Sequence, residues 1–80
     1  MELYEKVKDM VAEKFKIDRS KIGNETNFFA ELGADSLEML SFVSEIEKKY
    51  SVTVSSQELD NLYCVDNIVK FLSAATQSSH

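Results

Sequence analysis

The chain has 80 residues, of which 44% are hydrophobic and 29% are charged, with two glycines and no proline. These proportions are ordinary for one globular domain, and the scarcity of turn-forming residues favours helices over a turn-rich β architecture. The formal net charge is −5, from 14 acids and 9 bases, so nucleic acid and anionic membrane surfaces are poor partners.

The cysteine content and the N-terminal sequence both favour the cytoplasm. The single cysteine, Cys64, cannot form an internal disulfide, as is typical of proteins from a reducing compartment. Residues 1–5 are charged and lack the apolar run of a secretory signal. A membrane-spanning helix needs about 18 consecutive apolar residues, and no stretch of the sequence approaches this length.

The first predicted helix covers residues 2–16. Leu3, Val7, Met10 and Val11 recur at helical spacing, followed by Phe15. Acids and lysines that cancel in charge fill the other positions, a pattern typical of a solvated helix face.

Residues 17–34 are predicted to form a long connection that wraps the helices. Such loops tend to be functional or internally packed. We expect a short helical turn around Phe28 to Glu31, and we expect the apolar residues to anchor the loop: Ile22, Phe28, Phe29 and Leu32.

The second predicted helix runs from Ser36 to about Tyr50. Asp35 is a good N-cap, and Glu38 lies three residues later, where a capping box requires it. The core stripe of this helix is predicted to be Met39, Phe42, Val43, Ile46 and Tyr50. Leu37 and Leu40 fall outside the stripe, so they are candidates for partner contact, with the edge of the core as the alternative for Leu40.

Two further helices are predicted toward the C-terminus. Residues 51–54 are β-branched but have no strand to pair with, so we expect an extended loop. Ser55 and Glu58 form a second capping pattern that opens a short helix to about Leu62. The last helix should cover Val65 to Ala74. We therefore predict one domain over residues 1–75 and a polar tail over residues 76–80.

Nucleophilic and metal chemistry find little support in the sequence. The only histidine is His80, and the Gly-x-Ser-x-Gly elbow of hydrolases is absent around Ser36. No zinc-ligand spacing exists, and Glu58, Asp60 and Asp66 lack the spacing of a calcium loop. We expect no catalytic residues and no metal, and we assign Cys64 a structural position.

Ser36 is the remaining candidate, as a modification site at the positive end of a helix. Taken alone, a serine after an aspartate is usually only a helix start. The run from Gly33 to Leu37, with Asn27 to Leu32 before it, resembles the prosthetic-group attachment site of acyl carrier proteins. The resemblance extends from about Leu3 to Leu72.

The resemblance implies an all-α fold, a small right-handed bundle of three main helices plus one short helix. It also implies that a phosphopantetheinyl transferase moves 4′-phosphopantetheine from coenzyme A onto Ser36, with Asp35 helping to position the transferase's substrate or metal. The arm then holds acyl, aminoacyl or peptidyl groups as thioesters, while the protein itself is not an enzyme.

The sequence departs from fatty-acid carriers of this family in its charge. Ser41 and Lys48 stand at positions that are often acidic there, and residues 37–50 carry a net charge of only −1, from three glutamates and two lysines. The proline that commonly precedes the third helix is missing. These differences favour a polyketide, specialised lipid or nonribosomal peptide pathway; general fatty-acid synthesis and an unmodified acidic interaction module are the alternatives.

The expected partners are enzymes. Besides the transferase, they are an acyl- or aminoacyl-loading ligase and ketosynthase- or acyltransferase-type enzymes. The carrier itself is expected to be a monomer. We expect the partner contacts at the start and along one face of the second helix: Leu37, Glu38, Leu40, Ser41 and Glu47.

Overall fold

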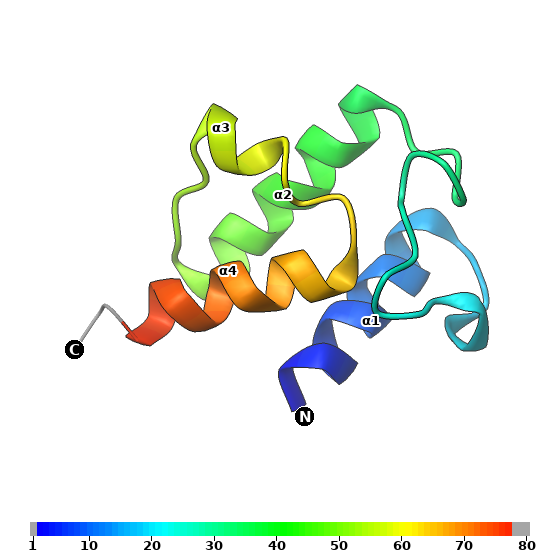
Figure 1. Ribbon diagram of the computed structural model, residues 1–80, viewed down its shortest axis with the longest axis horizontal. Coiled ribbons are helices and arrows are strands. Elements are labelled where there is room, and N and C mark those ends of the chain that lie inside the picture. The colour runs from blue at the N-terminus through cyan, green and yellow to red at the C-terminus, as the bar shows by residue number, and fades with distance from the viewer. Residues whose placement is uncertain (1, 78–80) are drawn as a thin grey trace.

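The computed structural model describes residues 2–77, which contain four α-helices and one short 3₁₀-helix (Figure 1). They are α1 (Glu2–Phe15), η1 (Arg19–Lys21), α2 (Ser36–Tyr50), α3 (Ser56–Leu59) and α4 (Val65–Gln77). This range contains no strand, so the all-α prediction of three main helices and a short one is confirmed. No helix within it is long and apolar enough to cross a membrane.

Most of the predicted boundaries hold, and the exceptions have local causes. The bounds of α2 are as predicted, and α1 ends one residue early because Lys16 takes a left-handed conformation with φ of 56°. The short helix η1 was not predicted. It begins after Asp18, whose carboxylate accepts the N–H of Ser20 at 3.0 Å.

The last two helices differ from prediction in length. The predicted end of α3 at about Leu62 is wrong, because Asn61 and Leu62 donate to carbonyls three residues back and the chain leaves the α conformation after Leu59. Helix α4 continues past Ala74 to Gln77, since neither glycine nor proline stops it there. The rest of the predicted tail, residues 78–80, lies outside the described residues.

One apolar core joins α1, α2 and α4. The predicted stripe of α2 is confirmed, since Met39, Phe42, Val43 and Ile46 are all buried and Tyr50 packs against the core from its edge. The other helices contribute buried side chains at helical spacing: Val7 and Val11 from α1, and Val65, Ile68, Val69 and Leu72 from α4.

The connection between η1 and α2 is packed against this core, as predicted, but one of its four predicted anchors is wrong. Ile22 and Phe28 are buried and Leu32 is partly buried, whereas Phe29 is 45% exposed. Glu31 donates its N–H to the carbonyl of Asn27 at 2.9 Å, the i→i−4 bond of a single helical turn, so the expected short helical turn is present, and it does not continue as a helix. Because Phe28 occupies the core, its neighbour Phe29 faces outward.

Three aromatic rings hold the connection in place. Phe28 packs against both Phe15 of α1 and Phe42 of α2, whose ring centroids each lie 6.1 Å from its own. The Phe15 and Phe42 rings are 5.7 Å apart in an edge-on arrangement. Such pairs add to the free energy gained by burial alone.

Backbone hydrogen bonds dock the same segment on the linker before α4. The N–H of Phe28 donates to the carbonyl of Tyr63 at 2.8 Å, and the N–H of Asp66 donates to the carbonyl of Asn24 at 2.8 Å. Further along, Ala34 donates to the carbonyl of Phe28 at 3.0 Å. The long connection is therefore a fixed part of the fold up to the start of α2.

Replacing Phe42 by alanine should remove most of the domain's stability. A large-to-small change at a fully buried aromatic residue costs about 3–5 kcal/mol, and small domains have only about 5 kcal/mol in total at the lower end. The free energy of unfolding, measured by urea denaturation, tests this. Phe29→Ala is the matched control and should stay close to the parent; a stable Phe42→Ala protein would contradict the assigned core.

The carboxylate of Asp66 links the first and last helices. It accepts a hydrogen bond from the Tyr4 hydroxyl of α1 and pairs with Lys70 one turn further along α4, at 3.1 Å. The Tyr4 hydrogen bond, followed by that of Lys70, lowers the pKa of Asp66 below its ordinary value of 3.8. The same contact with Asp66 raises the pKa of Tyr4.

Asp66 should therefore make stability depend on pH. A carboxyl group whose pKa is lower in the folded state stabilises the fold above its unfolded pKa and loses this contribution as the pH falls through the folded pKa. Asp66→Asn should be less stable than the parent at pH 7, and the difference should shrink below about pH 4. Urea denaturation at several pH values checks this, with Asp60→Asn as an exposed control. A difference that stays constant down to pH 2 would contradict the role of the charge.

Candidate functional site

The start of α2 carries the predicted capping box. The carboxylate of Asp35 accepts the N–H of Glu38 at 2.8 Å, and the carboxylate of Glu38 accepts the N–H of Asp35 at 3.1 Å. Asp35 itself is extended, with φ of −102° and ψ of 176°. Ser36 is thus the first helical residue, on a helix end that is held by two reciprocal hydrogen bonds.

Gly33 and Ala34 set the direction in which the chain enters α2. Gly33 has φ of +70°, a conformation that side chains other than hydrogen disfavour, although a Cβ there would meet no atom within 4 Å. Ala34 is buried and pins the chain against the core. The backbone turn, and not crowding, therefore explains the glycine, and the turn leaves Asp35 and Ser36 on the surface.

Ser36 presents a free hydroxyl at this helix end. The side chain is exposed and makes no hydrogen bond with the described residues. The N–H groups of the first helical turn point the same way and have no carbonyl partner within the helix, which favours a negative group at this position. A phosphate ester on the Ser36 oxygen is compatible with this environment, because the side chain is exposed and has no hydrogen bond to lose.

A shallow cavity of about 190 Å³ adjoins Ser36 between α2 and α3. Six residues line it: the polar Ser36 and Asp60, and the apolar Phe29, Met39, Leu40 and Leu59. The cavity offers room and apolar contact beside the hydroxyl.

Three of the four exposed large apolar side chains of the described residues line this cavity or neighbour Ser36 in the chain. Leu37 is 76% exposed, Leu40 is 50% exposed and Phe29 is 45% exposed. Tyr63, the fourth, belongs to the linker on which Phe28 is docked. Leu40 is therefore outside the core, and Phe29 joins the site although the sequence assigned it to the interior.

Two residues predicted to contact partners already have partners within the chain. Ser41 accepts a hydrogen bond from Lys14 of α1 at 2.7 Å. Glu47 is half-buried, and its carboxylate accepts the N–H of Val54 at 2.8 Å. Glu47 thereby holds the linker between α2 and α3. The predicted contacts at Leu37, Glu38 and Leu40 lie next to Ser36, whereas Ser41 and Glu47 lie further along the helix.

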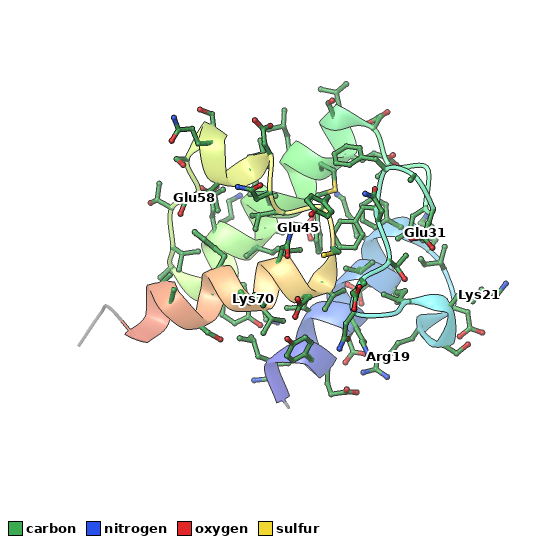
Figure 2. All side chains as sticks on the ribbon, in the orientation of Figure 1. Arg19, Lys21, Glu31, Glu45, Glu58 and Lys70 are labelled. Atoms are coloured by element: carbon green, nitrogen blue, oxygen red, sulfur yellow. The ribbon has the colours of Figure 1, made fainter. Side chains whose placement is uncertain are left out.

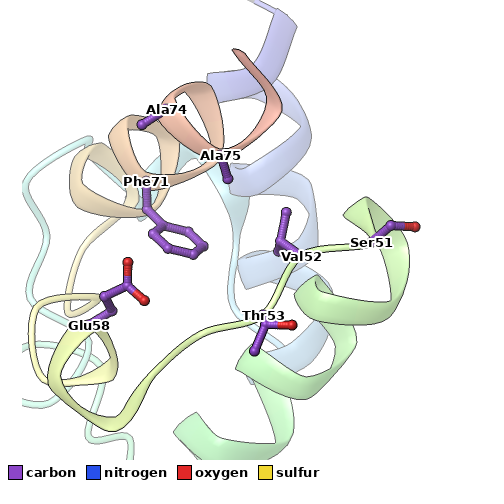
Figure 3. A pocket seen from close by; sticks show the side chains of 7 residues that line it. All are labelled: Ser51, Val52, Thr53, Glu58, Phe71, Ala74 and Ala75. Atoms are coloured by element: carbon purple, nitrogen blue, oxygen red, sulfur yellow. The ribbon is translucent and has the colours of Figure 1, made fainter. Parts of the chain in front are cut away.

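A larger cavity lies elsewhere, and its lining offers little for chemistry. It has a volume of about 430 Å³ and opens between the α2–α3 linker and α4. Figure 3 shows Phe71 projecting from α4 toward this linker, where Val52 and Thr53 lie. Its one charged side chain, Glu58, already accepts the N–H of Ser55 in the capping box of α3. Cys64 is buried at the start of α4, and residues 2–77 hold no cluster of three potential metal ligands.

Comparisons with known proteins agree with this geometry. Residues 5–72 match the family model described as "Phosphopantetheine attachment site". An acyl carrier protein of Clostridium acetobutylicum is 31% identical over 75 residues, which cover 94% of this chain and 97% of the relative. An acyl carrier protein of Aster yellows witches'-broom phytoplasma is 36% identical over 74 residues, covering 92% and 97%.

The fold comparison leads to the same group of proteins. A solved acyl carrier protein of Enterococcus faecalis superimposes with a TM-score of 0.80, covering 92% of this chain and 94% of that one, at 23% identity. The family match implies a covalently attached 4′-phosphopantetheine, and members of the family are carriers and not catalysts. With the matched region spanning most of the chain and an exposed serine at the start of α2, the chain belongs to the acyl carrier protein family.

Proposed function

We propose that Ser36 is the attachment point of 4′-phosphopantetheine and that the chain carries acyl or aminoacyl groups between biosynthetic enzymes. The observation that carries this proposal is the exposed Ser36 hydroxyl, free of internal hydrogen bonds, at a helix start held by a complete capping box. When bound, the arm supplies a thiol that holds the cargo as a thioester. Its length and flexibility raise the effective concentration of that cargo at each enzyme visited.

The chain's own residues hold and present the attachment point. The capping box fixes the backbone at the start of α2, and the exposed Ser36 hydroxyl there is accessible to a phosphopantetheinyl transferase. Asp35 uses one carboxylate oxygen for the capping hydrogen bond. Its other oxygen makes no hydrogen bond with the described residues, so it is available to position the transferase's substrate or metal.

The apolar side chains around Ser36 form the proposed docking surface for partner enzymes. It consists of Phe29, Leu37 and Leu40, with Glu38 beside them. Exposed aromatic and aliphatic side chains that enter a partner's pockets supply much of the binding free energy in protein interfaces. The enzymes that load, extend or transfer the cargo would read this surface.

The low charge along α2 supports a specialised polyketide, lipid or nonribosomal peptide pathway. Residues 37–50 have a net charge of −1, so attraction to basic enzymes would be modest. The curated relatives carry the general name acyl carrier protein, and this favours fatty-acid synthesis as the second candidate.

Ser36→Ala should abolish modification. Incubating the apo chain with coenzyme A and a broad-specificity transferase should add one phosphopantetheine to the parent, read as an intact-mass increase. Ser44→Ala removes an exposed serine from the same helix and should be modified normally. Labelling of Ser36→Ala would overturn the assignment. A parent that stays unmodified would favour an interaction module that is never modified.

Leu40→Ala should weaken enzyme binding without changing the fold. Truncating a side chain at the centre of an interface costs about 1–2 kcal/mol, or roughly 5- to 30-fold in affinity. The transferase KM for the apo chain should rise accordingly, with kcat preserved and little dependence on salt. Leu40→Met retains the apolar contact and is the control. An indifferent Leu40→Ala together with steep salt dependence would show that recognition is electrostatic.

A further inference from the structure

Helix α1 places a positive charge on the surface of α2 through Lys14. The Lys14 ammonium lies 2.7 Å from the Ser41 hydroxyl and 3.0 Å from a carboxylate oxygen of Glu45. Ser41 and Glu45 are one turn apart on α2, so a single ammonium reaches both. The Lys14 side chain is 25% exposed and that of Glu45 is 54% exposed, so the pair lies at the surface.

This contact distinguishes Glu45 from the other acids near Ser36. In each of the others, a carboxylate oxygen accepts a hydrogen bond from a backbone N–H and no basic side chain within residues 2–77 offsets the charge. The acceptor and donor pairs are Glu31 with Asn27, Asp35 with Glu38, Glu38 with Asp35 and Glu47 with Val54. Among the five acids from Glu31 to Glu47, Glu45 alone forms an ion pair with a basic side chain of the described residues. The negative surface is therefore interrupted in the third turn of α2.

Stability is a poor explanation for the contact. Ion pairs between solvent-exposed side chains contribute little to folding, because solvent screens them and ordering two long side chains costs entropy. The packing of α1 is already accounted for by Val7, Val11 and Phe15 in the core. The main consequence of the Lys14 ammonium is thus a change in the surface charge that a partner meets.

We propose that Lys14 is a specificity-determining residue for partner docking, and this rests on the carrier function proposed above. By pairing with Glu45, Lys14 offsets one negative charge in the third turn of α2, whereas Asp35 and Glu38 beside Ser36 have no basic partner among the described residues. The partner that fits is an enzyme with basic side chains opposite those two residues and a neutral or acidic surface opposite Ser41 and Glu45. An enzyme that requires a negative charge in the third turn is disfavoured.

The test compares four variants as substrates of one enzyme whose docking surface is basic. Lys14→Met removes the charge and keeps the aliphatic stem, whereas Lys14→Arg keeps the charge. Lys21→Met changes the net charge equally, but on η1, at the edge of the molecule in Figure 2, away from Glu45. The double variant Lys14→Met with Glu45→Gln removes both partners of the pair. Thermal unfolding followed by circular dichroism verifies that each variant is folded.

The probe enzyme is a malonyl-transferring acyltransferase of fatty-acid synthesis with a docking surface rich in lysine and arginine, acting on the phosphopantetheinylated protein. Lys14→Met should lower its KM about threefold at low ionic strength, with kcat unchanged, because an unpaired Glu45 strengthens electrostatic encounter. The effect should vanish at about 0.5 M salt, where charges are screened beyond a few ångström. Lys14→Arg, Lys21→Met and the double variant should behave like the parent.

The outcomes separate the two proposals. A KM that is unchanged in Lys14→Met, or lowered equally in Lys21→Met, overturns the role of Lys14 and leaves the carrier function intact. A parent that accepts no phosphopantetheine overturns the carrier function, and the role of Lys14 with it.

Discussion

The burial of Phe28 is the constraint on which the rest of the structure depends. Its ring closes the aromatic cluster with Phe15 and Phe42, and its backbone bonds both to the linker before α4 and to Ala34. Connections between helices are normally free to vary in conformation, but the packing of Phe28 fixes this one in relation to three helices. Because Ala34 is held two residues before Ser36, the position of the candidate attachment serine follows from the packing of a phenylalanine eight residues away.

The site beside that anchor has the arrangement expected of an attachment point, an exposed serine at a helix start that a capping box holds. A catalytic serine needs a base within hydrogen-bond reach and an enclosed environment that excludes water, whereas Ser36 is exposed and makes no hydrogen bond with the described residues. A carrier needs the opposite arrangement, in which a rigid part of the fold holds a hydroxyl that other enzymes can reach. The capping box supplies the rigidity, and the exposed apolar side chains of Phe29, Leu37 and Leu40 form the proposed docking surface.

The acids of α2 have different partners within the fold. Glu38 caps the helix, Glu47 fixes the linker to α3, and Glu45 pairs with Lys14 of α1. Hydrogen bonds to backbone amides leave the charge of a carboxylate available to the surface, and an ion pair cancels it. The charge that the surface of a carrier presents therefore cannot be obtained by counting its acidic residues alone.

The sequence by itself determined the features that depend on near neighbours. The bounds and capping box of α2, its buried stripe and the capping of α3 follow from spacings of three and four residues, because helical hydrogen bonds and side-chain contacts act over those distances. Only the tertiary structure decided which of Phe28 and Phe29 is buried, since a loop has no periodicity to separate adjacent residues. It also decided the pairing of Lys14 with Ser41 and Glu45, which lie 27 and 31 residues away, because contacts of that range depend on how the helices pack.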